Sequence, residues 1–326
     1  MPELYRPWPS ATGPEPGDLV LLTPEDAGWD YAGLRVIRLE PGVTRTVVMG
    51  ECEAFVLPLA GGLTMEVAPW PAPAGAEPAG AEPAEARFDL AGRGSVFERV
   101  TDFGYAGRDS LLRLTSAAGA EVALPLARCD HRRPPKYGPA EQVPVEVRGS
   151  GPATRQVTNF GSPGAWDHAE RLIACELITP GGNWSSYPPH KHDLTDPCPT
   201  PNEEIYFFKV AGPDGTTPSR EGFGLHRTFT GPEHVKAGLA ELDETVEVRD
   251  GDVFCIPYGY HGPCVAAPGY DLYYLNVLAG PGTGADRTMA FCDDPAHTWI
   301  RATWDDTPPD PRCPVTSASG RPPNTP

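Results

Sequence analysis

The sequence predicts an all-β protein built from two barrels of short strands. In both halves of the chain, short runs rich in β-branched and aromatic residues alternate with Gly- and Pro-containing turns. Gly (36) and Pro (41) are both abundant among the 326 residues, which suits a turn-rich β protein better than a helical one. Helical periodicity is nearly absent, and its best stretch, Glu233–Ala240, is about two turns long.

Regular spacing of strands in the first half favours a barrel or a sandwich. Strands are expected at residues 34–39, 45–49, 52–57, 63–67, 111–114 and 121–126. Turn pairs such as Pro41-Gly42 and Gly61-Gly62 separate them. Residues 68–86 repeat a Gly-Ala-Glu-Pro unit in which almost nothing can be buried, so a mobile low-complexity loop is expected there.

The main shift in composition lies at residues 128–152, where Arg128, Arg132, Arg133 and Lys136 stand among prolines. This stretch is either a solvated linker or a cationic arm that contributes to a pocket or a subunit contact. A boundary near residue 145 predicts one domain over 1–145 and a second over 146–326 with a Pro-rich tail. Strands of the second half are expected at residues 172–179, 222–230, 244–249, 253–256 and 271–278.

Charge and hydropathy limit the classes of partner. The formal net charge of −18 argues against nucleic acid and against an anionic membrane, although a local cationic pocket remains compatible with a small anionic substrate. The sequence has neither an apolar run long enough to cross a bilayer nor a signal-peptide pattern, so a cytoplasmic protein is expected. The eight cysteines form no C-x-x-C motif and are expected to be reduced thiols.

One stretch carries the pattern of a metal site. His190 and His192 are two residues apart, which places both imidazoles on one face of a strand. Glu204 heads the next β-type run, and His261 follows a Pro-containing bend. Three imidazoles and one carboxylate suit one divalent transition metal: Zn, Mn, Fe or Ni. Only one half offers this set, so the first barrel is expected to hold no metal.

Other histidines and one cysteine carry weaker signals. A lone histidine is more often a packed or surface residue than a ligand, and this applies to His131, His168, His234 and His297. Cys198 lies in the loop between the predicted ligands and is a minor alternative ligand. Strand alternation groups Glu204 with Tyr206 but does not decide whether the face of Glu204 or that of Glu203 lines the barrel.

The His-x-His pair, the downstream Glu and the later His after Gly251-Asp252 resemble the cupin pattern. Two departures are a longer loop before Glu204 and a gap from Gly259 to His261 that is one residue shorter than usual. The strings NWSSYPPHKHD, EEIYFFK, GFGLHRTFT and IPYGYHGPCVAAPGYDLYYLNVLAG are more specific. They resemble the family of 5-deoxy-glucuronate isomerase and 4-deoxy-5-hexulose-uronate ketol-isomerase, most clearly over residues 155–304.

The resemblance implies a bicupin with a divalent metal, most often zinc, and it selects Glu204 as the carboxylate ligand. It also implies conversion of 5-deoxy-D-glucuronate to 5-dehydro-2-deoxy-D-gluconate in inositol catabolism. Such an aldose–ketose isomerisation passes through an enediolate, whose charge a bound metal can stabilise. A homo-oligomer is expected because barrels with exposed sheet edges commonly pair.

Roles for further residues follow from their chemistry near the predicted ligands. The hydroxyl and imidazole groups that could move the proton belong to Tyr206, Tyr260, Tyr274 and His226. The cations that could bind the substrate carboxylate belong to Arg227, Arg301 and Lys209. Two alternatives are an iron-dependent bicupin dioxygenase with the same ligands and a sugar-acid-binding bicupin without activity.

Overall fold

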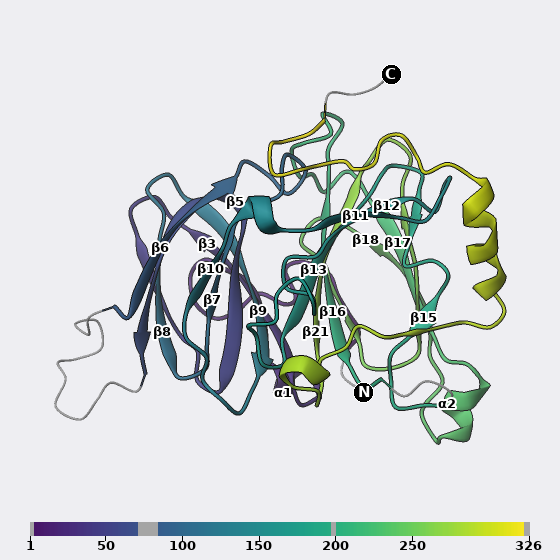
Figure 1. Ribbon diagram of the computed structural model, residues 1–326, viewed down its shortest axis with the longest axis horizontal. Helices are drawn as coiled ribbons and strands as arrows, with labels where there is room; N and C mark the ends of the chain where they lie inside the picture. The colour runs from purple at the N-terminus through teal and green to yellow at the C-terminus, as the bar shows by residue number, and fades with distance from the viewer. Residues whose placement is uncertain (1–2, 71–83, 197–199, 323–326) are drawn as a thin grey trace.

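The computed structural model describes residues 3–70, 84–196 and 200–322, and it confirms the all-β prediction. Its strands form sheets of nine, seven and six strands. Figure 1 shows two groups of strands side by side, with β3 to β10 in one group and β11 to β18 in the other. The bicupin architecture expected from the duplicated pattern is therefore present.

The first barrel supplies the nine-stranded sheet, whose main path runs β10-β7-β5-β9-β3-β2. Its strands are β2 (Asp18–Leu22), β3 (Ala32–Leu39), β4 (Thr44–Val48), β5 (Cys52–Pro69), β6 (Ala86–Arg93), β7 (Phe103–Ala106), β8 (Ser110–Thr115), β9 (Ala120–Arg128) and β10 (Lys136–Gly138). A single helical turn, α1 (Pro24–Ala27), joins β2 to β3. Most of the expected insert, residues 71–83, lies outside the described residues, so its mobility stays a prediction.

The second barrel supplies the other two sheets. Its strands are β11 (Val145–Arg148), β12 (Arg155–Thr158), β13 (Ile173–Thr179), β14 (Trp184–Ser185), β15 (His190–Lys191), β16 (Glu203–Val210), β17 (Gly224–Phe229), β18 (Asp243–Val248), β19 (Val253–Ile256), β20 (Tyr260–Ala266), β21 (Leu272–Ala279) and β22 (Cys292–Asp293). The helices are α2 (Pro232–Lys236), η1 (Ala140–Gln142), η2 (Gly284–Asp286) and η3 (Thr298–Asp306).

The two barrels repeat one strand order and exchange their edge strands. The seven-stranded sheet runs β1-β19-β16-β21-β13-β12-β11; its first six strands match the main path of the first barrel's sheet in order, and β11 is an additional edge strand. Strand β1 (Tyr5–Arg6), at the start of the chain, pairs with β19 of the second barrel. Strand β10, which precedes the second barrel, pairs with β7 of the first. Each barrel therefore lends its leading segment to the other, and the basic stretch is structured rather than a solvated linker. The division into domains at residue 145 stays a prediction.

Three apolar clusters fill the molecule. One fills the first barrel with apolar side chains such as Val56 and Met65. A second fills the second barrel and includes Tyr206 and Phe208. The third lies between the two large sheets and contains residues of both, such as Phe55 and Phe207. Strand β16 thus turns one face inward and the other toward the first barrel.

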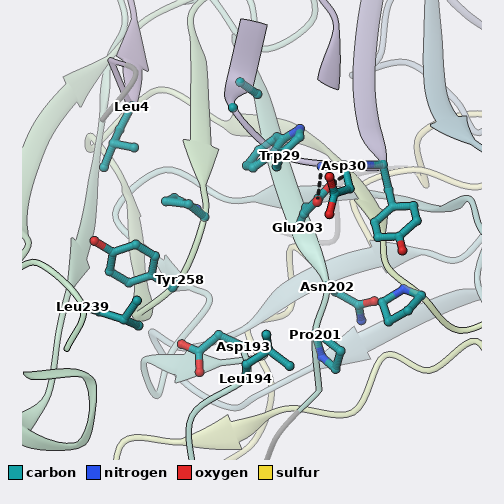
Figure 2. A pocket seen from close by; sticks show the side chains of 15 residues that line it. Leu4, Trp29, Asp30, Asp193, Leu194, Pro201, Asn202, Glu203, Leu239 and Tyr258 are labelled. Atoms are coloured by element: carbon teal, nitrogen blue, oxygen red, sulfur yellow. Dashed lines mark hydrogen bonds between the residues drawn. The ribbon is translucent and has the colours of Figure 1, made fainter. Parts of the chain in front are cut away.

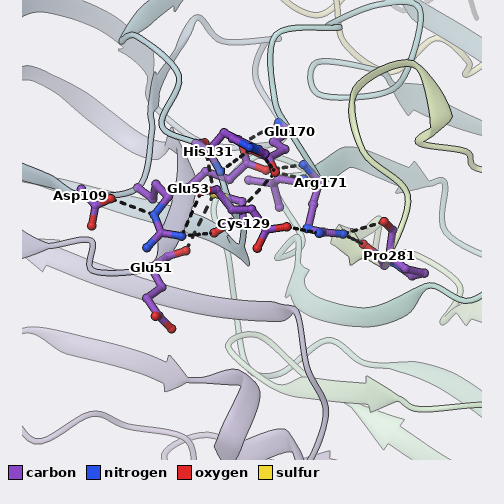
Figure 3. A network of polar contacts seen from close by, with 12 residues as sticks. Glu51, Glu53, Asp109, Cys129, His131, Glu170, Arg171 and Pro281 are labelled. Carbon is purple, nitrogen blue, oxygen red and sulfur yellow. Dashed lines mark hydrogen bonds and ion pairs between the residues drawn. The ribbon is translucent and has the colours of Figure 1, made fainter.

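Two carboxylates fasten the barrels together: the buried Glu53 (Figure 3) and the half-buried Glu203. Glu53 on β5 accepts hydrogen bonds from the backbone N–H groups of Glu170, Arg171 and Leu172 at 2.8, 2.6 and 2.8 Å. Glu203 on β16 of the second barrel accepts three hydrogen bonds from backbone N–H groups of the first barrel, those of Asp30, Tyr31 and Ala32, at 2.7, 2.8 and 2.7 Å. The two carboxylates hold equivalent register positions, because Glu53 lies opposite Ala127 and Glu203 lies opposite Ala279.

Among the described residues, no helix is long and apolar enough to cross a membrane. Six cysteines are free thiols, as expected: Cys52, Cys129, Cys175, Cys255, Cys264 and Cys313. Cys292 is disulfide-bonded, so the expectation of reduced thiols is wrong for that residue.

Candidate metal centre

Three of the predicted ligands meet inside the second barrel. Ligand atoms of His192, Glu204 and His261 all lie within 4.8 Å of one another, and all three residues are buried. Glu204 Oε2 lies 2.9 Å from His192 Nε2 and 3.1 Å from His261 Nε2. Residues from β16, β20 and the end of β15 thus converge on one point of the barrel.

His190 lies on the strand next to His261 but is not a member of this group of three, so its place among the ligands stays a prediction. The two residues are direct partners across β15 and β20, and their ring centroids are 4.4 Å apart. Nδ1 of His190 lies 3.2 Å from the Pro188 carbonyl, and Nδ1 of His192 lies 2.9 Å from the Asn202 carbonyl. When Nδ1–H donates to a carbonyl, Nε2 is left free as a ligand, which is the usual arrangement of metal-binding histidines.

The ring nitrogens of His261 show that this donor set fits a metal. Both are buried and make no hydrogen bond, although Glu204 stands beside one of them. Buried polar atoms are almost always hydrogen-bonded, so an orphaned imidazole surrounded by other ligand groups is unusual. Three imidazoles and a carboxylate are the donors that divalent transition metals prefer. The predicted alternative ligand Cys198 lies outside the described residues.

Electrostatics favour the protonation states that ligands need at three of the four groups. Burial and the neighbouring histidines lower the pKa of His190, and burial also lowers the pKa of His261. Burial opposes the ionised form of Glu204, but His261 and His192 outweigh it and lower the pKa of Glu204. At His192, burial favours the neutral imidazole, but the hydrogen bond to Glu204 outweighs burial and raises the pKa. Neutral imidazoles at His190 and His261 beside an ionised Glu204 are therefore favoured at neutral pH, whereas His192 is shifted toward its protonated form and has to release that proton to bind a metal.

A second layer of contacts fixes the two loops that carry the ligands. Lys191 points away from the ligand face, as strand alternation predicts, and its buried Nζ donates to Asp193 Oδ1 at 3.2 Å. Oδ2 of Asp193 accepts a hydrogen bond from the Gly259 N–H and lies 2.8 Å from His234 Nε2. Asp193 thereby ties the loop after His192 to the turn before His261. His234 is thus a packed structural residue, as expected for a lone histidine.

A pocket of about 110 Å³ opens on this cluster. Its walls include alternate residues of four neighbouring strands, because residues two apart on a strand share a face. These wall residues are Arg155 and Val157 on β12, Cys175 and Leu177 on β13, Asn276 and Leu278 on β21, and Glu204 and Tyr206 on β16. Asn276 Nδ2 donates to Glu204 Oε1 at 2.9 Å, which leaves Oε2 for the histidines.

Two of the predicted catalytic residues lie at or next to this pocket. Tyr206 lines it, and its hydroxyl lies 3.2 Å from Ser186 Oγ. Ser186 Oγ is in turn 3.0 Å from the hydroxyl of Tyr274. Burial raises the pKa of both tyrosines well above the usual value, so both hydroxyls stay protonated and can donate.

The other two predicted catalytic residues do not reach the pocket. His226 lies deeper in the barrel, with Nε2 3.0 Å from Thr228 Oγ1, and burial lowers its pKa to about 3. Tyr260 packs between the rings of Phe229 and His234, each 5.6 Å away. The sequence placed both near the ligands along the chain, but the strands carry them to other parts of the barrel.

Of the predicted carboxylate-binding cations, only Arg301 lines the pocket, where it forms a bidentate ion pair with Asp293 at 2.5 and 2.7 Å. Arg227 is not part of the site. It alternates with the inward-facing His226 on β17 and pairs with Asp243, at 2.9 Å, on the outer face. Lys209 is also elsewhere, because it shares the outer face of β16 with Phe207 and pairs with Glu121 of the first barrel at 2.6 Å.

Four pocket residues with charged, hydroxyl or amide side chains were not predicted from the sequence: Arg148, Arg155, Ser186 and Asn276. Arg148 lies within the basic stretch, so the cationic-arm reading contained a usable signal for it. For the other three, no sequence pattern distinguishes a polar residue that faces a pocket from one that faces solvent.

A second, larger pocket of about 520 Å³ lies between the barrels (Figure 2). It is lined mainly by apolar groups, among them Trp29, Leu194 and Tyr258, and it shares no lining residue with the metal pocket. The chemistry-bearing side chains gather in the smaller pocket, so the smaller pocket is the candidate site.

Two barrels share one strand order, and among the described residues a His/Glu cluster that could hold a metal lies in the second barrel alone; together these features define a metal-type bicupin. Residues 9–300 match the KduI/IolB family, and the chain belongs to that family. This confirms the resemblance drawn from the sequence strings.

Curated relatives and solved structures agree with the assignment. The chain is 35% identical over 296 residues to a 5-deoxy-glucuronate isomerase of Geobacillus kaustophilus, covering 90% of this chain and 94% of the relative. It is 32% identical over 283 residues to that of Bacillus subtilis strain 168, covering 86% and 91%. An IolB-like protein of Salmonella typhimurium superposes with a TM-score of 0.74 at 28% identity, covering 92% of this chain and 99% of the other. An oxalate decarboxylase of Bacillus subtilis shares the fold alone, with a TM-score of 0.57 at 12% identity and coverage of 94% and 84%. The family and the relatives' names support an isomerase.

Proposed function

We propose that this protein converts 5-deoxy-D-glucuronate to 5-dehydro-2-deoxy-D-gluconate in inositol catabolism. The observation that carries the proposal is the similarity, over 90% of the chain, to a 5-deoxy-glucuronate isomerase. The pocket supports it independently, because a His/Glu cluster and three arginines surround one small cavity. Such a lining suits a small anionic molecule that carries neighbouring oxygens.

The proposed reaction moves one hydrogen and leaves the oxidation state of the sugar unchanged. A proton leaves the carbon next to the aldehyde, an enediolate forms, and a proton returns to the former aldehyde carbon. Negative charge develops on two neighbouring oxygens during this transfer. No external oxidant or reductant is needed.

His190, His192, Glu204 and His261 would hold the metal, for which we propose zinc, with Mn, Fe and Ni accepted by the same donors. A divalent metal in this position supplies Lewis-acid stabilisation of the enediolate charge. Asn276 and the Asn202 carbonyl orient Glu204 and His192 before any substrate arrives. Such preorganisation means that the ligands need little rearrangement during the reaction.

The hydroxyl of Tyr206 is the pocket's best-placed proton donor among the four predicted catalytic residues. Tyr206 lines the cavity, and its hydroxyl stays protonated. The centroid of its ring lies 6.1 Å from that of the His261 ring. Ser186 and Tyr274 continue a chain of hydroxyls behind it, with a further contact of 2.8 Å to Ser185. We propose that this chain donates hydrogen bonds to substrate oxygens. A cytoplasmic location and a homo-oligomeric state stay predictions.

Anaerobic incubation with 5-deoxy-D-glucuronate in deuterated water tests the proposal. NMR should show the ketose product carrying deuterium at the former aldehyde carbon, from an enzyme that needs no oxygen. Turnover that requires oxygen would instead support the dioxygenase alternative. Binding without product and without proton exchange would support the sugar-acid-binding alternative.

A further inference from the structure

Two arginines face each other at one wall of the metal pocket. Arg148 on β11 and Arg155 on β12 are direct partners across the antiparallel pair, and both line the cavity. Like charges directly opposite on neighbouring strands destabilise a sheet. This arrangement therefore lowers stability unless negative groups neutralise both guanidinium groups.

Arg155 is the more unusual member of the pair. Its residue is only 7% exposed, and its Nε is buried without a hydrogen-bond partner. Nη1 donates to the carbonyl of Ala153 at 3.2 Å, and no carboxylate of the described residues forms an ion pair with Arg155. Burial, with a smaller effect of Arg148 and Arg301, lowers the pKa of Arg155 to about 10, so the group is still charged at neutral pH.

The neighbouring arginines have partners of their own. Arg148 pairs with Glu146 at 2.8 Å, and Arg301 is held by both oxygens of Asp293. Only Arg155 thus presents a buried guanidinium with unused donors to the cavity. An unpaired buried charge is costly, and a planar carboxylate is the group that a guanidinium binds best through two parallel hydrogen bonds.

The position of Arg155 suits one end of a short acid. Along the sheet, β12 and β16 are three strand spacings apart, which is roughly 14 Å between their backbones. Arg155 and Glu204 line the same pocket from these two strands. A six-carbon acid bound at Arg155 could therefore place its far end at the His/Glu cluster.

We propose that Arg155 binds the carboxylate of the sugar-acid substrate, with Arg148 adding positive charge beside it. This inference rests on the proposed function for the identity of the substrate. The role of Arg155 is that of a specificity-determining residue, because it separates uronates from neutral sugars of the same size. Molecules that lack the carboxylate should bind with the same affinity whether or not Arg155 is present.

Calorimetric titration of the metal-loaded protein with D-glucuronate and, separately, with D-glucose tests this role. The two probes differ in a carboxylate against a hydroxymethyl group. Arg155→Met should weaken D-glucuronate binding by about 100-fold, as expected for the loss of charge-assisted hydrogen bonds, and should leave D-glucose binding unchanged. Arg155→Lys should give an intermediate loss, because it keeps the charge but not the planar fork. Arg227→Met, on the outer face, is the matched control and should bind both probes as the unsubstituted protein does.

Thermal unfolding of the same variants separates binding from folding. Arg155→Met should unfold at the same temperature or a higher one, since it removes an unpaired buried charge. Equal affinity of Arg155→Met and the unsubstituted protein for D-glucuronate would overturn the inference. Equal affinity of the unsubstituted protein for the two probes would overturn it as well. If Arg155→Met loses D-glucuronate binding while the unsubstituted protein fails to isomerise 5-deoxy-D-glucuronate, the inference stands and the proposed function fails.

Discussion

Glu204 is the side chain on which the cluster depends. One carboxylate oxygen contacts both His192 and His261, and the other accepts a hydrogen bond from Asn276. The neutral Asn276 amide thus fixes the rotation of a carboxylate that has to stay ionised in a buried site. Groups that orient ligands in this way commonly affect metal affinity nearly as strongly as the ligands themselves.

Replacing Asn276 with Leu should weaken metal binding by about 10- to 100-fold, because Glu204 loses the contact that orients it. Competition with a chromophoric chelator gives the metal affinity directly. Asn159→Leu is a suitable control, because Asn159 contacts Glu146 near the surface at 3.4 Å and does not line the pocket. Unchanged affinity of Asn276→Leu would show that Glu204 is oriented by other contacts.

His226 makes stability depend on pH. Burial lowers its pKa from 6.5 to about 3, so the folded protein keeps it neutral. Between these values the unfolded chain binds a proton that the folded chain does not. Stability is therefore complete above about pH 6.5 and falls as the pH drops toward about 3, by up to about 1.4 kcal/mol per pH unit.

Chelator-treated protein and its His226→Gln variant should therefore differ in the slope of stability against pH. Denaturant unfolding from about pH 6 to about pH 4 should give a flatter dependence for the variant, by up to about 1.4 kcal/mol per unit. Metal-free protein is required because acid also protonates the ligands. Parallel slopes would mean that His226 titrates alike in the folded and unfolded chains.

The residue scale also shows what the sequence can and cannot predict. Strand spacing placed His190 and His192 near each other, and both rings lie beside His261, at 4.4 and 4.7 Å between ring centroids, although the role of His190 as a ligand stays a prediction. Arg227 and Lys209 were wrong as carboxylate-binding residues, since which face of a strand lines a cavity depends on the partner strands. Arg155 was missed for the same reason.

At the scale of elements, β16 joins the site to the frame of the molecule. Odd-numbered residues of β16 face the first barrel, and even-numbered ones face the interior of the second. Glu203 therefore binds backbone groups of the first barrel, while its neighbour Glu204 enters the metal cluster. Glu53 on β5 repeats the fastening role from the other barrel. The next residue of β5 is Ala54, which belongs to the apolar interior of the first barrel. Each barrel thus has a structural carboxylate at the equivalent position, but the next residue is a predicted metal ligand in the second barrel and an alanine in the first.

Glu53→Ala should destabilise the protein by about 3 kcal/mol or more. The substitution leaves three backbone N–H groups and the Tyr105 hydroxyl without their acceptor in a buried interface. Denaturant unfolding measures the effect. Glu51→Ala, two residues earlier in an exposed ion pair with Arg128, should change stability by less than about 1 kcal/mol. Equal effects of the two substitutions would contradict the fastening role.

The longer elements were predictable because β-branched runs between turns mark them in the sequence. The two-residue strands β1, β14, β15 and β22 carry no periodicity of their own. They form because an edge of a neighbouring sheet offers unpaired backbone groups. The exchange of β1 and β10 between barrels is a tertiary property that no local pattern encodes.

For the molecule as a whole, the apolar layer between the sheets makes the barrels interdependent. Buried polar contacts cross the same layer: Arg93 of the first barrel pairs with Glu176 of the second, whose Oε1 also accepts a hydrogen bond from Tyr273 at 2.8 Å. Separating the barrels would expose both the apolar layer and these charges. The interface therefore resembles a core more than a contact between independent domains.

The protein should consequently unfold in one cooperative transition. Calorimetry should give a calorimetric enthalpy equal to the van't Hoff enthalpy, because neither barrel is stable with its half of the shared core exposed. Two separated transitions would show that each barrel folds independently.

The proposed function requires that a metal at His190, His192, Glu204 and His261 makes this fold a sugar-acid isomerase. Its most direct test is the rate of 5-deoxy-D-glucuronate isomerisation while chelator-treated protein is titrated with zinc. We expect negligible activity at the start, a linear rise to one equivalent per chain, and no rise in a Glu204→Gln variant. Full activity in the metal-free protein would contradict it.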